Sequence, residues 1–457
     1  MIKKLLIANR GEIAVRVIRA AKELGIKTVA VYSEADKDCL HTILADEKIC
    51  IGPGPSSESY LSIPNIISAC EVTNADAVHP GYGFLSENSY FAEVCETCGI
   101  TFVGPSKDSM EKMGDKIEAK KIAKSAGVPT VPGIEGSITN PEDPALIKEV
   151  KKIGFPVIIK AAMGGGGKGM RIVTSEEGLR VALLTAMEES KKAFSSDKVY
   201  IEKYIEEPKH IEIQILADKK GKVVYFPERD CSVQRRHQKL IEESPSATVG
   251  ERTRRHLGRA AVKLVEKIGY TSAGTIEFIM DKKGNFYFME MNTRIQVEHP
   301  VTEMVSGIKG KAGLDLVKEQ ILIAAGEKIK YDSEDVTILG HAIECRVNAE
   351  DPDKDFMPSP GRIENIMFPG GNGVRIDSHV YAGYTIPTYY DSLVAKVITL
   401  SYNRSKTIDK MIRTLNEFKV NGIKTTIPFH LKVLNTQAFR EGDVCTNFLQ
   451  KYIYEQR

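Results

Sequence analysis

The sequence predicts an α/β protein, α+β overall, that opens with a Rossmann-like parallel sheet. Residues 3–32 have the pattern of strand, helix and strand at the lengths of a βαβ unit. Residues 156–173 place four adjacent glycines between two apolar strands. Residues 275–291 have the pattern of two strands joined by a turn at residues 281–285. We therefore expect a parallel N-terminal sheet followed by β-rich modules.

The N-terminal part alternates strands and helices. Its helix at residues 13–24 is expected to end at Gly25, because glycine tolerates the backbone of a helix end. Gly11 lacks the two further glycines of a dinucleotide-binding loop, so we exclude NAD binding by this loop. The strands of this sheet are predicted at residues 4–8, 28–32, 75–79 and 100–103.

A second module begins near residue 115. A helix is predicted at residues 117–126, and a linker rich in proline and glycine follows at residues 128–136. A strand at residues 156–160 then leads into a glycine loop, which a strand at residues 171–173 follows.

The glycine loop has the composition of a phosphate-binding flap. Its glycines are Gly164, Gly165, Gly166 and Gly167. Their backbone N–H groups can approach phosphate oxygens because no Cβ interferes. Lys160 and Lys168 add positive charge. No Lys-Ser/Thr pair opens a helix, so this is not a Walker loop. A flexible surface loop is the alternative.

The hairpin at residues 275–291 is predicted to pair two acids. If it is centred between Lys283 and Gly284, Glu277 lies directly across from Glu290. Like charges in that position destabilise a sheet unless a cation neutralises them. Oxygen ligands from both carboxylates and from Asn292 suit magnesium that holds nucleotide phosphates. A solvated hairpin face with unrelated acids is the alternative.

The segment at residues 290–299 is predicted to continue as a strand. One face would carry Glu290, Asn292, Arg294, Gln296 and Glu298, and the other Met291, Thr293, Ile295 and Val297. Five polar side chains on one face are difficult to explain as packing, because charged groups are seldom buried unless paired. We interpret this strand as the floor of a reaction site.

Two further segments present polar side chains. A strand at residues 210–216 alternates His210, Glu212 and Gln214 with isoleucines, and a packed strand histidine is the alternative role for His210. Residues 228–239 are dense in hydrogen-bond donors. A nucleic-acid patch is the rival interpretation, but the segment has no interleaved aromatic residues, so anion binding within a cleft is favoured.

A strand at residues 339–348 carries Glu344 and Arg346 on one face. Arg346 is a candidate site residue, and a salt bridge to Glu344 is the alternative. Helices at residues 407–418 and 428–434 are predicted to form a capping subdomain.

The composition excludes several classes of function. The 457 residues include 63 lysines and arginines against 61 aspartates and glutamates, so no overall field recruits nucleic acid or a membrane. We find no apolar run of membrane-spanning length and no secretory signal, and we expect a cytoplasmic protein. The eight cysteines lack the spacing of a zinc site, and we assign no disulfide.

With these segments described, the chain resembles the biotin carboxylase family of ATP-grasp enzymes over nearly all its length. The resemblance rests on Ala-Asn-Arg-Gly-Glu at residues 8–12, His-Pro-Gly-Tyr-Gly at residues 79–83 and Glu-Cys-Arg-Val-Asn at residues 344–348. It also includes residues 113–116, the glycine loop, residues 228–239 and residues 290–302. One departure is an insertion of roughly residues 309–314, whose role is open.

The resemblance implies a role for each site residue. Catalysis would rest on Glu298, the family's base, with Lys239, Arg294 and Arg346. ATP and bicarbonate would be bound by Lys116, Lys160, Gly164, Gly165, Gly166, Gly167, Met170, Glu202, Lys203, His210, Gln234, His237, Gln296 and Val297. Glu277, Glu290 and Asn292 would hold Mg²⁺ or Mn²⁺. Tyr82 and Glu87 are weaker candidates.

The resemblance also implies the reaction and its partners. Bicarbonate and ATP would form carboxyphosphate, and its carboxyl group would pass to biotin on a carrier protein in trans. We expect an N-terminal domain at residues 1–114, an ATP-grasp domain at 115–335 with a lid at about 132–205, and a C-terminal domain at 336–457. The chain has no Met-Lys-Met tripeptide, so the biotin carboxyl carrier protein and the carboxyltransferase subunit would be separate chains.

Family members are commonly homodimers, and the final carboxyl acceptor is not encoded in this sequence. The rival enzyme class is a ligase that passes carboxyphosphate or an acyl phosphate to an amine. A catalytically silent nucleotide-binding subunit is the other alternative.

Overall fold

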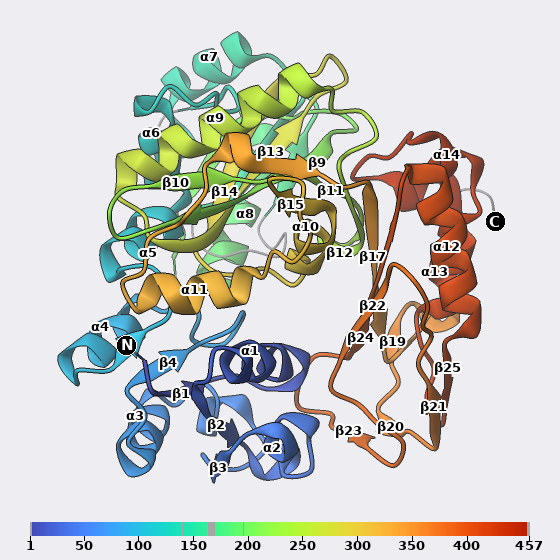
Figure 1. Cartoon of the computed structure of the whole chain (residues 1–457). Helices are drawn as coiled ribbons and strands as arrows, with labels where there is room; N and C mark the ends of the chain where they lie inside the picture. Colours follow the sequence, from blue (N-terminus) through green and yellow to red (C-terminus); the bar gives the residue numbers. More distant parts are fainter. Residues whose placement is uncertain (1, 135, 139, 163–169, 195, 455–457) are drawn as a thin grey trace.

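The computed structural model describes residues 2–134, 136–138, 140–162, 170–194 and 196–454. The predicted glycine flap at residues 164–167 therefore lies outside the described residues. In Figure 1 the chain runs from the blue N-terminal sheet through the green and yellow central elements to the orange and red C-terminal region.

The N-terminal sheet is parallel and has the order β3-β2-β1-β4-β5, which confirms the predicted Rossmann-like sheet. Leu5 and Ile7 pack on one side of β1, while Leu6 packs on the other, so both faces are buried as a parallel sheet requires. The strands are β1 (Lys4–Ile7), β2 (Lys27–Tyr32), β3 (Glu47–Cys50), β4 (Ala77–His79) and β5 (Thr101–Phe102). The helices are α1 (Gly11–Glu23), α2 (Leu40–Leu44), α3 (Ile63–Thr73) and α4 (Ser89–Thr97).

A nine-stranded sheet forms the centre of the molecule, in the order β14-β13-β9-β11-β12-β17-β24-β22, with β10 paired to β9. Its first strands are β9 (Lys209–Ala217), β10 (Val223–Tyr225), β11 (Arg229–Arg235), β12 (Gln238–Ser244), β13 (Ser272–Met280) and β14 (Phe286–Asn292). The helix α9 (Glu251–Ile268) covers this part with a buried stripe that includes Leu257, Ala261 and Leu264. The opposite side chains of β9 are therefore free to form a site.

A separate three-stranded sheet, in the order β7-β6-β8, holds the residues on either side of the glycine loop. It comprises β6 (Val157–Ala161), β7 (Arg171–Val173) and β8 (Val199–Lys203), and it packs with α7 (Pro144–Ile153) and α8 (Leu179–Phe194) around its own core. The helices α5 (Lys107–Gly114) and α6 (Lys116–Ser125) connect it to the N-terminal sheet.

The C-terminal region extends the central sheet with β17 (His341–Asn348), β24 (Leu393–Ser401) and β22 (Val374–Ser378). The helices α12 (Arg404–Glu417) and α13 (Ile427–Leu434) lie on its outer side in Figure 1 and confirm the two helices predicted in the tail. The helices α10 (His299–Val305) and α11 (Leu316–Ala324) precede this region.

The strand predicted through residues 290–299 is wrong beyond Asn292, where β14 ends. The backbone N–H of Thr293 donates to Glu87 Oε1 at 3.0 Å instead of to a strand. Pro300 then lies in the first turn of α10, which begins at His299. Residues 293–298 are therefore an irregular segment whose shape depends on distant residues.

The predicted pairing of Glu277 with Glu290 is confirmed, although the hairpin is not centred where we expected. Phe278 pairs with Phe288 and Met280 with Phe286, so the turn is centred on Lys283. A β-bulge between Glu277 and Phe278 shifts the register by one residue and brings the two acids opposite each other.

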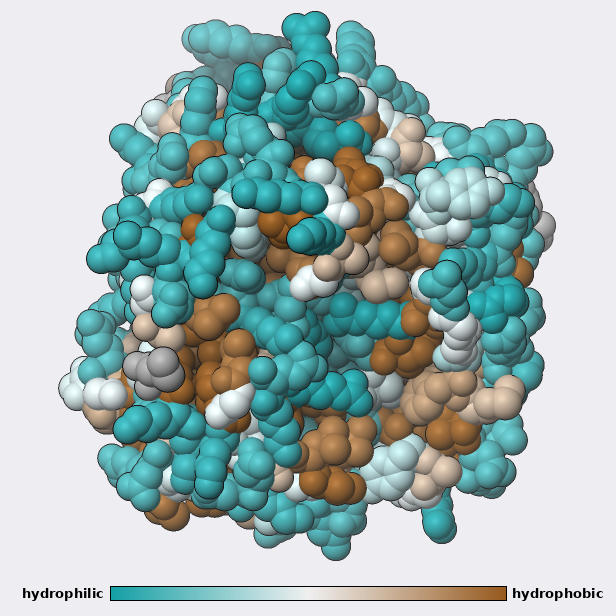
Figure 2. Space-filling view, in the orientation of Figure 1, coloured by the Kyte–Doolittle hydropathy of each residue, from teal (hydrophilic) through white to brown (hydrophobic). Residues whose placement is uncertain are grey.

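The face in Figure 2 is mainly hydrophilic with hydrophobic patches between the polar residues. Met357, Met367 and Phe368 of the C-terminal region are among the exposed large apolar side chains. Within the described ranges, no helix combines the length and the apolar character needed to cross a bilayer.

Candidate active site

A cavity of about 650 Å³ lies between the central sheet and the three-stranded sheet. Every described residue to which the resemblance assigned a role lines it, whereas the weaker candidates Tyr82 and Glu87 do not. The residues with an assigned role are Lys116, Lys160, Met170, Glu202, Lys203, His210, Gln234, His237, Lys239, Glu277, Glu290, Asn292, Arg294, Gln296, Val297, Glu298 and Arg346. These predicted residues therefore share one cavity, although the extended strand that was to align some of them is absent. Apolar lining residues such as Ile158, Ile279 and Met289 were not predicted.

Lys239 is the centre of the charge network. It lies near the start of β12, and its Nζ is 2.6 Å from Glu212 Oε2, 2.9 Å from Glu277 Oε1 and 2.7 Å from Glu298 Oε1. Burial alone would lower the pKa of Lys239, but the three carboxylates hold it well above its usual value. Lys239 is therefore a permanent cation that fixes three acids from different elements.

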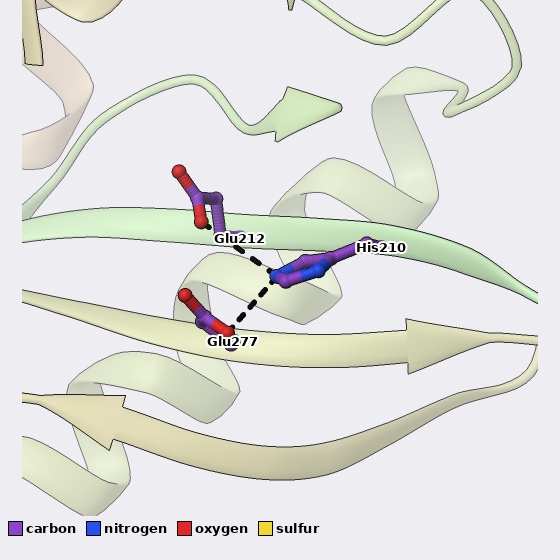
Figure 3. Close-up of side chains that lie close together, drawn as sticks. All are labelled: His210, Glu212 and Glu277. Carbon is purple, nitrogen blue, oxygen red and sulfur yellow. Dashed lines mark ion pairs between the residues drawn. The ribbon is translucent and has the colours of Figure 1, made fainter. Parts of the chain in front are cut away.

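Figure 3 shows His210 and Glu212 of β9 turned toward Glu277 of the neighbouring strand β13. His210 Nε2 is 3.0 Å from Glu277 Oε2 and 3.8 Å from Glu212 Oε2. Burial would raise the pKa of Glu277, but Lys239 and His210 hold it well below its usual range. Lys239 pairs with both carboxylates and Arg229 with Glu212, so we interpret the contacts among these three side chains as part of an ion-pair network.

Glu277, Glu290 and Asn292 could hold a divalent cation from one side of the cavity. The two acids are cross-strand partners that both line the cavity, and Asn292 Nδ2 donates to Glu277 Oε1 at 2.9 Å. Glu290 Oε2 is 3.0 Å from Lys116 Nζ, and its side chain is about one-third exposed. Carboxylate and amide oxygens are the ligands that Mg²⁺ prefers, so these residues fit that ion.

A second set of cations lies on the three-stranded sheet and on α6. Lys160 Nζ is 2.8 Å from Glu202 Oε2, and Lys120 also pairs with Glu202. These two lysines hold the pKa of Glu202 below its usual value although burial alone would raise it. Lys203 Nζ donates to the carbonyls of Gly154 and Phe155 at 3.0 Å each.

Arg346 joins the central and C-terminal parts of the site. Its Nε donates to Glu242 Oε1 at 2.6 Å and its Nη2 to Glu298 Oε2 at 2.8 Å. The alternative salt bridge to Glu344 is wrong, because neither carboxylate oxygen of Glu344 has a hydrogen-bond partner among the described residues. Arg346 therefore faces the site and not its neighbour along β17.

Glu298 is ionised in this setting. Burial would raise its pKa, but Lys239, Arg346 and Arg229 hold it well below its usual range. Nearby, Arg294 Nε donates to Glu87 Oε2 at 2.9 Å, and Arg294 Nη2 donates to Asn292 Oδ1 at 3.0 Å. Glu87, a weaker candidate from the sequence, thus orients a site arginine.

The sequence did not single out Arg229, whose side chain is fully buried. Arg229 donates to Glu212, Gln214, Thr275, Gln296 and Thr302. The segment 228–239 thus divides in function. Gln234, His237 and Lys239 line the cavity, whereas Arg235 and Arg236 pair with Asp355 outside it. The sequence signal that could have identified Arg229 was an arginine at a position of an alternating strand where a buried side chain is expected.

An adjoining cavity of about 500 Å³ shares Lys239, Val297 and Arg346 with the first. Tyr82 of the N-terminal part lines it, as do residues 386–388 and 390–393 of the C-terminal part. Arg346 and Lys239 therefore separate two spaces large enough for two different substrates.

The central sheet, the three-stranded sheet and the charged cavity between them define an ATP-grasp type of ligase. Residues 115–331 match the family "Carbamoyl-phosphate synthase L chain, ATP binding domain". Residues 1–110 match "Biotin carboxylase, N-terminal domain", and residues 344–451 match "Biotin carboxylase C-terminal domain".

The chain is 56% identical over 453 residues to biotin carboxylase 1 of Bacillus subtilis, covering 99% of both chains. It matches the crystal structure of the Campylobacter jejuni biotin carboxylase in a β-γ-ATP complex with a TM-score of 0.94, at 49% identity and 99% coverage of both chains. The biotin carboxylase domain dimer of the Hydrogenobacter thermophilus 2-oxoglutarate carboxylase, in complex with MgADP, ADP and bicarbonate, matches with a TM-score of 0.92 at 49% identity, over 98% of this chain and 97% of that one. The chain belongs to the biotin carboxylase family, whose members are ATP-dependent ligases and serve as subunits or domains of biotin-dependent carboxylases.

Proposed function

We propose that this chain uses ATP to transfer the carboxyl group of bicarbonate to biotin on a carrier protein, with the site residues in the roles below. The observation that carries the proposal is the meeting of Lys239, Arg294, Glu298 and Arg346 at one end of a cavity that the phosphate-side lysines also line. A bicarbonate ion bound among these four residues would contact cations on several sides and the ionised acid Glu298.

The nucleotide would occupy the larger cavity. Lys116 and Lys160 are placed to bind phosphate oxygens, and Glu202, Lys203, His237 and Met170 line the part nearer the lid. Glu277, Glu290 and Asn292 would hold Mg²⁺ or Mn²⁺, which when bound would neutralise charge on the transferred phosphoryl group. Lys116 would then be released from Glu290 to contact a phosphate.

In the first step a bicarbonate oxygen attacks the γ-phosphorus of ATP and ADP leaves. Lys239, Arg294, Gln296 and the Val297 backbone would orient bicarbonate, and ionised Glu298 would accept its proton. The products are carboxyphosphate and ADP. Fixed cations provide most of the stabilisation here, because their positions require no rearrangement during the reaction.

In the second step carboxyphosphate breaks into CO₂ and phosphate, and that phosphate takes the proton from the ureido nitrogen of biotin. Arg346 would stabilise the enolate-like biotin anion while its nitrogen forms a bond to CO₂. Arg346 lines both cavities, which supports a position between the carboxyl donor and a biotin that enters through the cavity beside Tyr82.

The carrier protein and the carboxyltransferase are proposed to be separate chains, since this chain covers 99% of a relative named biotin carboxylase. We also propose a homodimer, supported by the dimeric relative, and a cytoplasmic location. The domain division at residues 1–114, 115–335 and 336–457 is supported by the ends of the family matches, and the separate core of residues 138–201 supports a lid.

An ADP-release assay with bicarbonate, with and without free biotin, tests the proposal. Wild-type protein should show biotin-stimulated ADP release, and Glu298→Gln should reduce it by roughly 10²–10⁴-fold, because amide nitrogen and oxygen cannot take the proton. Glu96→Gln, on the exposed side of α4, is the matched control. Equal turnover of wild type and Glu298→Gln would remove Glu298 from the mechanism, and no bicarbonate-dependent turnover in wild type would refute the function.

A further inference from the structure

Lys396 is a fully buried lysine that the reaction steps above do not use. It lies on β24, directly across from Arg346 of β17, so the two side chains share a face of the sheet with Cβ atoms about 5 Å apart. On the other side Lys396 is paired in register with Asp377 of β22. The sheet therefore fixes the position of Lys396 relative to Arg346.

The ammonium group of Lys396 holds the irregular segment at residues 293–298. Its Nζ donates to the backbone carbonyl of Val297 at 3.0 Å. Val297 immediately precedes Glu298 and lines both cavities. Because this segment has no strand pairing beyond Asn292, this bond from the sheet to its backbone helps to fix where Glu298 lies, together with the bonds that the Glu298 carboxylate accepts from Lys239 and Arg346.

The same ammonium group also reaches the N-terminal part of the chain. Lys396 Nζ is 3.0 Å from Glu12 Oε1, and the Tyr82 hydroxyl donates to that same oxygen. Glu12 is the second residue of α1, and Tyr82 lines the cavity proposed for biotin. One buried cation thus links a carboxylate and a tyrosine of the N-terminal part to the sheet that carries Arg346.

Stability alone does not explain this arrangement. Removing an ammonium group from water costs more than a single surface pair returns, and an apolar side chain of similar length would fill the space. Positioning does explain it, because the two closest contacts of Lys396, with the Val297 carbonyl and with Glu12, lead to groups at the site, whereas its longer contact with Asp377, at 3.9 Å, leads away from it.

We propose that Lys396 is a positioning residue for carboxyl transfer to biotin, which sets Glu298 and the Tyr82 hydroxyl at fixed places around Arg346. The inference rests on the proposed function. It assigns to Lys396 an effect on the groups around Arg346 and not on nucleotide binding. Among the described residues, Lys116 and Lys160 pair with Glu290 and Glu202 and do not contact Lys396, Glu12 or Tyr82.

Steady-state kinetics with free biotin test the inference on the full chain. Lys396→Met keeps the side-chain length but leaves Glu12 buried without its cation, so the double variant Lys396→Met/Glu12→Gln is the main test. We expect its kcat/KM for biotin to fall on the order of 100-fold, as for a misplaced catalytic group, while the KM for ATP changes by less than about twofold. Lys406→Met, on the exposed side of α12, is the matched control.

Tyr82→Phe is a milder variant that removes only the hydroxyl resting on Glu12, and it should lower kcat/KM for biotin about tenfold with an unchanged KM for ATP. It decides the question if the Lys396 variants fail to fold. A folded double variant, or a Tyr82→Phe variant, with wild-type kcat/KM for biotin overturns the inference. A rise in the KM for ATP as large as the loss in kcat/KM for biotin also overturns it. If wild type itself does not respond to biotin, the proposed function is refuted as well.

Discussion

At the scale of single residues, the site contains one acid that does not behave as an anion. Glu344 of β17 is fully buried opposite Glu242 of β12, and neither of its oxygens has a hydrogen-bond partner in the described part of the chain. Burial, together with the charge of Glu242, raises the pKa of Glu344 well above its usual value. We therefore expect Glu344 to be protonated in the folded protein, which leaves the positive charge of Arg346 for Glu242, Glu298 and substrate.

Glu344→Gln is accordingly expected to stabilise the protein at alkaline pH. Above the usual pKa of glutamate the unfolded chain releases a proton that folded Glu344 keeps, so wild-type stability falls with rising pH by roughly 1.4 kcal/mol per unit. The variant lacks this loss, so its advantage in urea unfolding should grow from pH 6 to pH 8. The exposed Glu96→Gln serves as control. A variant that is less stable by a constant amount at every pH would show that Glu344 is ionised.

At the scale of elements, the helices and strands that local patterns predicted are present, whereas the ends of elements depended on distant residues. The pattern of β9 placed His210 and Glu212 correctly, since period-two alternation is set locally. The end of β14 was missed because Glu87, some two hundred residues away, takes the Thr293 N–H. The alternation of residues 290–298 was real in sequence, but it could not reveal that contact.

The polar residues that line the cavity were predicted better than the shape that brings them together. Chemistry selected Lys239, Glu298 and Arg346 by residue type and by the family motifs. The supporting residues Arg229, Glu12 and Lys396 were not selected, because each is recognised only by what it contacts across the fold. Buried partners of this kind leave no local signature.

The packing of α9 on the back of the central sheet leads to a prediction at the same scale. A Cβ at Gly258 would lie 2.2 Å from the ring of Tyr225 on β10, so this glycine allows the close approach of helix and strand. Gly258→Ala should cost about 1–3 kcal/mol of unfolding free energy, because Tyr225 must leave its packed position. Denaturant unfolding measures the loss.

The matched control is Gly114→Ala at the end of α5, where nothing lies within 4 Å of the new Cβ. There the better helix propensity of alanine should leave stability unchanged or raise it by up to about 1 kcal/mol. An equal effect of both substitutions would contradict the packing argument.

At the scale of the whole molecule, buried ion pairs connect parts of the chain that are distant in sequence. Arg16 of α1 pairs with Glu303 of α10 at 2.9 Å, and Arg375 of β22 pairs with the same carboxylate at 2.7 Å. Together with the contacts of Lys396, these pairs join the N-terminal helix, the segment before β17 and the C-terminal strands. Buried ion pairs, as well as hydrophobic packing, therefore fix how the parts of the site lie relative to one another.

Among these buried ion pairs, those made by Glu243 are expected to be sensitive to acid. Glu243 lies on β12, and it binds His341 of β17 at 2.8 Å and Arg404 of α12 at 2.7 Å through Oε2. Burial would raise its pKa, but His341 and Arg404 lower it to about 2. Because the folded pKa is depressed, the stabilisation is fully present above the usual glutamate pKa near 4.5 and is lost as the pH falls toward about 2.

Glu243→Gln should therefore cost roughly 3 kcal/mol of unfolding free energy at pH 7, and this cost should shrink as the pH falls from about 4.5 toward 2. Urea unfolding of wild type and variant at pH 7, 4 and 3 measures the difference. Asp409→Asn, which breaks an exposed pair with Arg440, should cost less than about 1 kcal/mol at every pH. If the cost of Glu243→Gln stays constant down to pH 3, Glu243 does not link the central sheet to α12 through its charge, and packing alone holds the two together.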